Sequence, residues 1–222
     1  MITVFVFIVC LISSLFILYM LTKHDFVLAR KSLLLQEIFD TTLVGYIAFL
    51  ITGRVLYIIS VQEFSLFNPL RFFHIFKFPG TLFLGGLLGF GLVIYYVFRK
   101  KKILTRLYDI YALSLFPIFL FTLLFSYSKG DFLYFNILIF LLSCLFMGIG
   151  IYSYKNYTLK DGSIAFLFVC LATVLTIVSE FSSSSRVVFS FFTISQVISI
   201  IVFIIFSSLL IMHEGIVKTK KK

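Results

Sequence analysis

A few polar and glycine positions interrupt long apolar stretches of this chain, and they are the positions with chemical potential. Arg54 is a permanent cation that can hold an anionic group. Tyr57 follows it by three residues, which puts both side chains on one face of a helix. The pair Gly85-Gly86 permits close approach of another backbone. Polar side chains inside long apolar stretches are costly to place in the hydrocarbon of a membrane and are commonly functional.

Seven apolar stretches must position these residues. Each is about as long as a helix that crosses a hydrocarbon layer ~30 Å thick, where backbone groups have no water partner. With 61% hydrophobic and 13% charged residues, the chain is predicted to be an all-α membrane protein with one seven-helix domain over residues 1–222. The stretches are Ile2–Leu21, Ile38–Ile59, Pro79–Phe98, Ile110–Tyr127, Phe132–Tyr154, Ser163–Val178 and Val188–Met212.

Lys and Arg are concentrated on alternate loops. Fourteen of the 19 basic residues fall in the first, third and fifth loops and the C-terminal tail. By the positive-inside rule, the N-terminus lies outside and the C-terminus is cytoplasmic. The net charge of +10 is therefore mostly a topology signal, and its scatter among helix ends argues against nucleic-acid binding.

The remaining features indicate no metal site and no cofactor. Cys10, Cys144 and Cys170 lie inside apolar stretches, and no pair has metal-site or redox spacing. The loop Ser60–Phe78 mixes aromatic and basic residues, which predicts a short segment in the outer interface. His74 of that loop is interpreted as a surface residue.

Two further polar residues share the predicted height of Arg54. At about 1.5 Å of rise per residue, Arg54 lies roughly 24 Å from the cytoplasmic start of its stretch. Glu180 falls at a similar height, and Gln196 and the glycine pair lie in the same outer zone. The alternative interpretation gives these residues no functional role. The Arg54 and Glu180 side chains then extend to the lipid headgroups, and the glycines only allow helix packing.

Several segments carry a resemblance, in order along most of the chain. FLGGLLG (Phe83–Gly89) resembles the F-H-G-G-L-I-G signature of the prolipoprotein diacylglyceryl transferases. Span number and orientation, read independently from charge, also agree with that family. Five more segments resemble its motifs: TGRVLYI (Thr52–Ile58), LYDIYALSLFP (Leu107–Pro117), KDGSIAF (Lys160–Phe166), IVSEF (Ile177–Phe181) and FTISQVISI (Phe192–Ile200).

The resemblance implies an activity in lipoprotein biosynthesis. Members of the family transfer a diacylglyceryl group from phosphatidylglycerol to the lipobox cysteine of a prolipoprotein, at the outer leaflet of the bacterial cytoplasmic membrane. The reaction needs cations for the lipid phosphate and a route to the cysteine thiolate. The family's catalytic His and Arg positions correspond here to Leu84, Leu123 and Thr176. Leucine neither carries a proton nor binds phosphate, so no catalytic residue is intact.

The sequence therefore predicts a divergent, transferase-like pseudoenzyme that keeps a phospholipid site but has lost or altered the chemistry. Arg54 would bind the lipid phosphate, and Tyr57 would line the same helix face. Gly85 and Gly86 would allow close approach, while Glu180 and Gln196 would order the polar floor. The expected partners are phosphatidylglycerol and lipoprotein precursors. Two alternatives remain open: an active transferase using replacement residues, and a non-enzymatic membrane scaffold.

Overall fold

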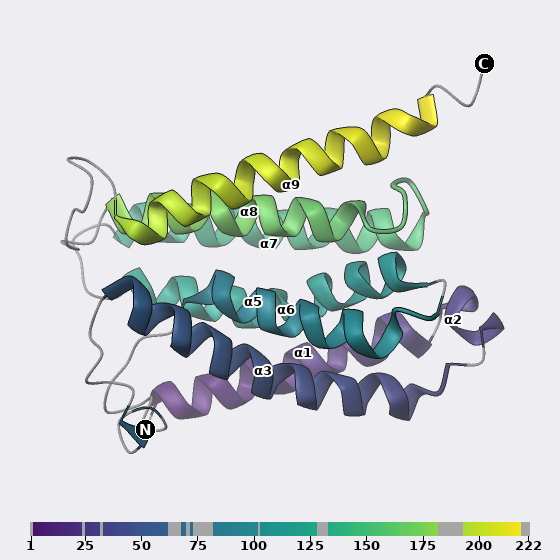
Figure 1. The fold of residues 1–222 in the computed structure, drawn as a ribbon, viewed down its shortest axis with the longest axis horizontal. Helices are drawn as coiled ribbons and strands as arrows, with labels where there is room; N and C mark the ends of the chain where they lie inside the picture. Colours follow the sequence, from purple (N-terminus) through teal and green to yellow (C-terminus); the bar gives the residue numbers. More distant parts are fainter. Residues whose placement is uncertain are drawn as a thin grey trace. The chain divides into compact units, whose positions relative to one another are not determined.

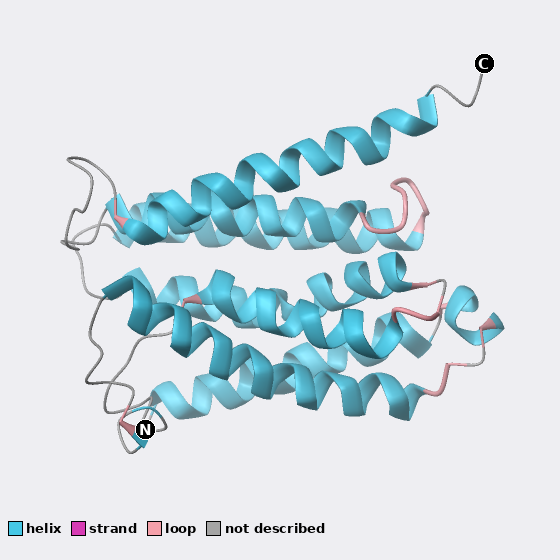
Figure 2. Cartoon of the chain, in the orientation of Figure 1, coloured by secondary structure: helices cyan, strands magenta, loops and turns pink. Residues whose placement is uncertain are grey.

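The described part of the chain is built from α-helices. The computed structural model describes residues 2–23, 25–31, 33–61, 68, 69, 72, 82–101, 103–127, 133–181 and 193–218. These residues form eight helices and no strand (Figure 2). Each of the seven apolar stretches overlaps one of these helices, so the all-α class is confirmed for the described residues. The helices are α1 (Ile2–Lys23), α2 (Phe26–Arg30), α3 (Leu35–Val61), α5 (Phe83–Phe98), α6 (Leu104–Tyr127), α7 (Leu133–Lys155), α8 (Ser163–Phe181) and α9 (Ile194–Lys218) (Figure 1).

Two helices in the described residues are long and apolar enough to cross a membrane, judged by length and composition. They are α3 over Leu35–Ser60 and α9 over Gln196–Gly215. In α9 only 11% of the apolar segment is buried, whereas the core helix of a soluble protein is mostly buried. The apolar runs described in α1, α5, α7 and α8 are shorter.

The chain divides into two compact units. Unit 1 comprises Met1–Val27 and Thr105–Lys222, and unit 2 comprises Leu28–Leu104. Each unit is described separately below. The expectation of one domain over residues 1–222 stays a prediction.

Unit 1 is centred on α6. The side chains of Leu107, Ile110 and Phe116 on this helix are completely buried. The Phe116 ring lies 5.9 Å from that of Phe146 on α7 and 5.5 Å from that of Phe168 on α8, measured between centroids. Aromatic contacts therefore join three helices, and α8 packs in turn along α9 (Figure 1).

The turn into α8 requires a glycine. Gly162 has φ +104°, a left-handed conformation that L side chains rarely adopt. The helix begins at the next residue, Ser163, which is the start predicted from the sequence. This position matters because the first backbone N–H groups of α8 receive a carboxylate, described below.

Unit 2 is held by close contact between α3 and α5. A Cβ atom added to Gly89 would lie 2.8 Å from the carbonyl oxygen of Ala48 and 2.1 Å from the hydroxyl oxygen of Thr52. A Cβ atom at Gly86 would lie 2.6 Å from the ring of Phe49. The missing side chains let the two helix backbones approach, as small residues do at helix interfaces in membranes.

We expect Gly89→Ala to destabilise the protein and Gly91→Ala to leave it unchanged or slightly more stable. The new methyl group at Gly89 would overlap α3, and such overpacking typically costs about 1–3 kcal/mol. A Cβ atom at Gly91 meets nothing within 4 Å, and alanine favours a helix by about 1 kcal/mol over glycine. Thermal unfolding in a mild detergent measures both changes. Equal stability of the two variants would contradict the close contact.

Candidate functional site

Arg54 is completely buried on α3. Its exposed fraction is 0%, and its guanidinium carbon lies 5.7 Å from the centroid of the Tyr57 ring. Arg54 therefore does not snorkel into solvent: the surrounding protein covers the whole side chain. A guanidinium keeps its charge in such surroundings, so the site is a buried positive charge seven residues before the end of α3.

The start of α5 lies directly against this part of α3. The backbone N–H of Leu82 donates to the carbonyl oxygen of Gly53 at 3.0 Å. A Cβ atom at Gly53 would lie 3.4 Å from the backbone nitrogen of Gly86, and one at Gly85 would lie 3.2 Å from the carbonyl oxygen of Thr52. Gly85 and Gly86 thus lie against the segment of α3 that carries Arg54 and Tyr57, and a shared lipid site stays a prediction.

The N-terminal end of α5 adds partial positive charge beside Arg54. Leu82 occupies the N-cap position and makes no side-chain hydrogen bond to the helix, and the first turn has no acidic residue. The dipole of a helix favours anions at its N-terminal end. The start of α5 therefore adds partial positive charge next to the segment of α3 that carries Arg54.

Gln196 has a structural partner in unit 1. The backbone N–H of Thr193 donates to its amide oxygen at 2.9 Å, and its own N–H donates to the Thr193 hydroxyl oxygen at 3.2 Å. This reciprocal pair is a capping box at the start of α9. Glu180 belongs to α8, but its side chain lies outside the described residues. A role for either residue in a lipid site stays a prediction.

The positions that correspond to the family's catalytic residues carry no acid–base group where they are described. Leu84 is 4% exposed on α5, packed inside unit 2. The Thr176 hydroxyl donates to the carbonyl oxygen of Ala172 on its own helix, at 2.7 Å. The side chain of Leu123 and all of His74 lie outside the described residues, as does most of the loop Ser60–Phe78.

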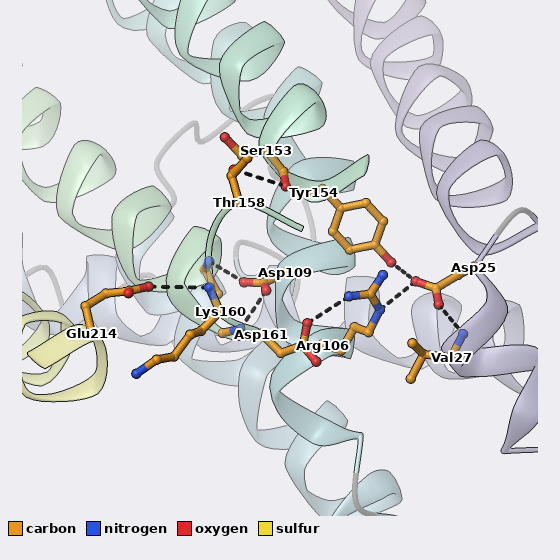
Figure 3. A network of polar contacts seen from close by, with 12 residues as sticks. Asp25, Val27, Arg106, Asp109, Ser153, Tyr154, Thr158, Lys160, Asp161 and Glu214 are labelled. Atoms are coloured by element: carbon orange, nitrogen blue, oxygen red, sulfur yellow. Dashed lines mark hydrogen bonds and ion pairs between the residues drawn. The ribbon is translucent and has the colours of Figure 1, made fainter. Parts of the chain in front are cut away.

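A second polar cluster, which the sequence did not indicate, lies in unit 1 (Figure 3). Arg106 on α6 donates through Nε to Asp25 at 2.7 Å and through Nη1 to Asp161 at 2.7 Å. The hydroxyl of Tyr154 also donates to Asp25. Arg106 is one of the fourteen basic residues assigned from sequence to the loops and the tail, but it lies inside α6, is 3% exposed and is paired with two carboxylates.

Asp25 is the other centre of that cluster. One of its oxygens accepts the N–H of Val27 at 2.8 Å, which caps the short helix α2, while the other accepts from Arg106 and Tyr154 (Figure 3). One buried carboxylate thus joins α2, α6 and α7. An Asp two residues before Val27 is a recognisable capping signal in the sequence, but its distant partners are not.

Asp109 on α6 binds the start of another helix, α8. Its two carboxylate oxygens accept the N–H groups of Gly162 at 2.6 Å and Ala165 at 2.8 Å. Asp109 lies in the second turn of its own helix, where the backbone N–H groups are already bonded within the helix, so its carboxylate is available to α8.

Ser163, His213 and Glu214 form a group that resembles a hydrolase triad only in composition. The hydroxyl of buried Ser163 donates to Glu214 Oε1 at 2.5 Å, and its oxygen lies 3.3 Å from His213 Nδ1. A triad needs the acid to orient the histidine, whereas here the acid binds the serine directly. The Lys160 ammonium donates to the carbonyl oxygen of His213, so the group attaches the end of α9 to the start of α8. Among the described residues no cluster of His, Cys, Asp or Glu could hold a metal ion.

We expect Asp109→Asn to lower the free energy of unfolding by about 1–3 kcal/mol, because asparagine has one acceptor oxygen and leaves a buried N–H donor without its partner. Asp40→Asn is the matched control, since Asp40 is exposed on α3 and should change stability by less than about 0.5 kcal/mol. Denaturant unfolding in detergent measures both variants, and equal effects would rule out the capping role.

The same residue predicts a pH dependence. Burial raises the pKa of Asp109 to about 7, against the opposing effect of the N–H donors of Gly162 and Ala165. Between about pH 4 and pH 7 the folded protein therefore holds a proton that the unfolded chain releases. The contribution of Asp109 to stability should fall as pH rises through this window and stay constant above it. This slope should be absent in Asp109→Asn; identical slopes in both proteins would contradict the shift.

Comparisons with known proteins add no relative. No family model matches the chain, and neither a curated protein nor a solved structure is significantly similar to it. The resemblance to the diacylglyceryl transferases therefore depends on the motifs quoted above.

Proposed function

We propose that this protein is a seven-span protein of the bacterial cytoplasmic membrane that binds the phosphate of phosphatidylglycerol at Arg54. The N-terminus would lie outside and the C-terminus in the cytoplasm, as the distribution of Lys and Arg predicts. The protein would be a divergent relative of the prolipoprotein diacylglyceryl transferases whose transfer chemistry is lost. The observation that carries the proposal is the complete burial of Arg54 in a helix of membrane-spanning length.

Membrane placement is supported by the apolar side chains that the helices leave exposed. On α3, Val44 and Ile47 are 55% and 60% exposed, and on α9 Ile204 and Ile211 are 57% and 71% exposed. Exposed apolar side chains along each of these helices are unfavourable in water and match the environment of lipid tails. The shorter apolar helices would complete their spans with the flanking residues.

Phosphate binding is supported by the combination of groups around Arg54. A buried guanidinium forms strong charge-assisted hydrogen bonds with phosphate oxygens. The start of α5 lies against Gly53, next in sequence to Arg54, and its N–H groups favour the same ligand. Gly85 and Gly86 have no side chains, so the start of α5 can lie close to α3. In the proposed orientation the site faces the outer leaflet.

Loss of chemistry is supported by Leu84 and Thr176. The family's histidine position holds a buried leucine, and Thr176 directs its hydroxyl to its own helix. Removing even one donor that stabilises charge in a transition state typically costs about 3–4 kcal/mol. A lipid could therefore bind beside Arg54 without transfer of its diacylglyceryl group.

The lipid proposal is tested by mass spectrometry of lipids retained after gentle purification. We expect phosphatidylglycerol to remain bound to the wild type and to be lost by at least about tenfold in Arg54→Gln, because the variant lacks the charge. Arg54→Lys should retain part of it. Arg30→Gln is the control, since Arg30 is exposed on α2 and lies outside the site. If Arg54→Gln retains as much phosphatidylglycerol as Arg30→Gln, Arg54 does not bind the phosphate.

The loss of chemistry is tested separately with a lipobox peptide and phosphatidylglycerol. We expect no transfer above background from the purified wild type. Turnover that disappears in Arg54→Ala would instead establish an active transferase that uses this arginine. Turnover that survives both Arg54→Ala and His74→Ala would exclude Arg54 as the lipid contact and His74 as a replacement base.

A further inference from the structure

Three helices end in the same way, with a tyrosine followed about one turn later by a basic residue. In α1 the Lys23 ammonium lies 5.3 Å from the Tyr19 ring centroid, and in α5 the Arg99 guanidinium carbon lies 5.1 Å from that of Tyr96. In the topology predicted from sequence, each of these ends faces the cytoplasm. The pairs are Tyr19 and Lys23, Tyr96 and Arg99, and Tyr152 and Lys155.

The end of α5 is the most exposed of the three and is followed by further positive charge. Tyr95 is 50% exposed and Tyr96 is 72% exposed. Arg99 and Lys100, in the turn after the helix, are exposed as well. The next lysine differs, because Lys101 is half-buried and forms an ion pair with Glu37 at 2.7 Å. Two adjacent cations thus lie on the surface beside two tyrosine rings.

The order of these residues along α5 matches the layers of a membrane interface. Leu88 and Leu92, which lie two turns and one turn before Tyr96, are apolar and are 49% and 65% exposed. Tyrosine rings, apolar with one polar end, concentrate at the headgroup level. Arg99 and Lys100 follow after about one turn, or roughly 5 Å, where lipid phosphates lie. Along α5 the side chains are therefore first apolar, then amphipathic and then cationic. This order matches the order of lipid tails, glycerol backbone and phosphates from the membrane centre outward.

We propose that the surface formed by Tyr95, Tyr96, Arg99 and Lys100 binds the headgroups of anionic phospholipids in the cytoplasmic leaflet. The tyrosines lie at the depth of the glycerol backbone, and the two cations contact the phosphates. This inference uses the membrane placement proposed above and does not use Arg54. It assigns a second lipid contact at the opposite end of the spans from the proposed Arg54 site.

The chain offers a direct test because it contains no tryptophan. Tyr96→Trp places a single fluorophore in the proposed surface, and Ile47→Trp places one at a 60% exposed position in the middle of α3. Each variant is reconstituted in vesicles of phosphatidylcholine with 30% phosphatidylglycerol, where bromine quenchers are carried by only one of the two lipids. Quenching per mole of brominated lipid reports which lipid lies beside the tryptophan.

We expect brominated phosphatidylglycerol to quench Trp fluorescence in Tyr96→Trp about fivefold more effectively than brominated phosphatidylcholine. The two lipids should quench equally in Ile47→Trp. Adding Arg99→Gln and Lys100→Gln to Tyr96→Trp, or raising the salt concentration to 0.5 M, should remove the preference. The lysine charge of Lys101 stays in place in this variant, so its ion pair with Glu37 is preserved.

Two results would overturn the proposal. Equal quenching by the two lipids in Tyr96→Trp would show that the surface does not select anionic headgroups. A preference that persists in the double glutamine variant would assign the selection to other residues. Neither result bears on lipid retention at Arg54, because the fluorescent variants leave that residue unchanged.

Discussion

Charge inside an apolar helical protein must be neutralised or used, and this requirement shapes unit 1. Removing an ion from water costs several kcal/mol even after relaxation of the surroundings, so a buried guanidinium needs close partners. Arg106 meets Asp25 and Asp161 at 2.7 Å each. Asp161 remains 47% exposed, which leaves part of its charge in water and reduces the desolvation it would otherwise incur. The cluster fixes α6 relative to the corner between α1 and α2 and to the turn before α8.

The backbone of Tyr157 is strained in a way that the same cluster explains. Its φ is 52°, a left-handed conformation that costs roughly 1–2 kcal/mol for a residue with a Cβ atom. The residue follows the end of α7, where glycine is usual, and the N–H of Thr158 returns to the carbonyl oxygen of Ser153 at 3.2 Å. In this conformation the centroid of the Tyr157 ring lies 4.7 Å from the Arg106 guanidinium carbon. The centroid of the Tyr154 ring lies 4.6 Å from the same atom. Cation–π contact offsets the strain that glycine would have avoided.

The sequence predicted the features that depend on local pattern. The α-helical class followed from seven apolar stretches, and the beginning of α8 at Ser163 and the end of α5 at Phe98 agree with the stretch limits. Gly85 and Gly86 were expected to allow close backbone approach, and α5 packs closely against α3 there. Helix periods and glycine positions are properties of neighbouring residues, so they can be read from the chain alone.

Contacts between distant segments could not be predicted in this way. Asp109 lies 53 residues before Gly162, whose N–H it accepts, and nothing in its own helix indicates that partner. Arg106 and Asp25 are separated by 81 positions. The capping box of Thr193 and Gln196 is different, because T-x-x-Q before an apolar run is a local signal. That local spacing indicates the start of α9, which the assignment of Gln196 to a lipid site did not use.

Two arginine–tyrosine pairs in unit 2 show how the same side chains acquire different roles. Along α3, Arg54 precedes Tyr57, so in the proposed topology the cation lies nearer the membrane centre than the ring. Along α5, Tyr96 precedes Arg99, so the ring lies deeper and the cation faces the headgroups. Exposure follows this order: Arg54 is 0% exposed, whereas Arg99 is on the surface. A cation that lies closer to the membrane surface than its tyrosine can reach water and lipid phosphates at little free-energy cost. That position suits a surface contact. A cation that lies deeper than its tyrosine and is covered by protein is far from water, and the proposed lipid phosphate beside the start of α5 would add to its stabilisation.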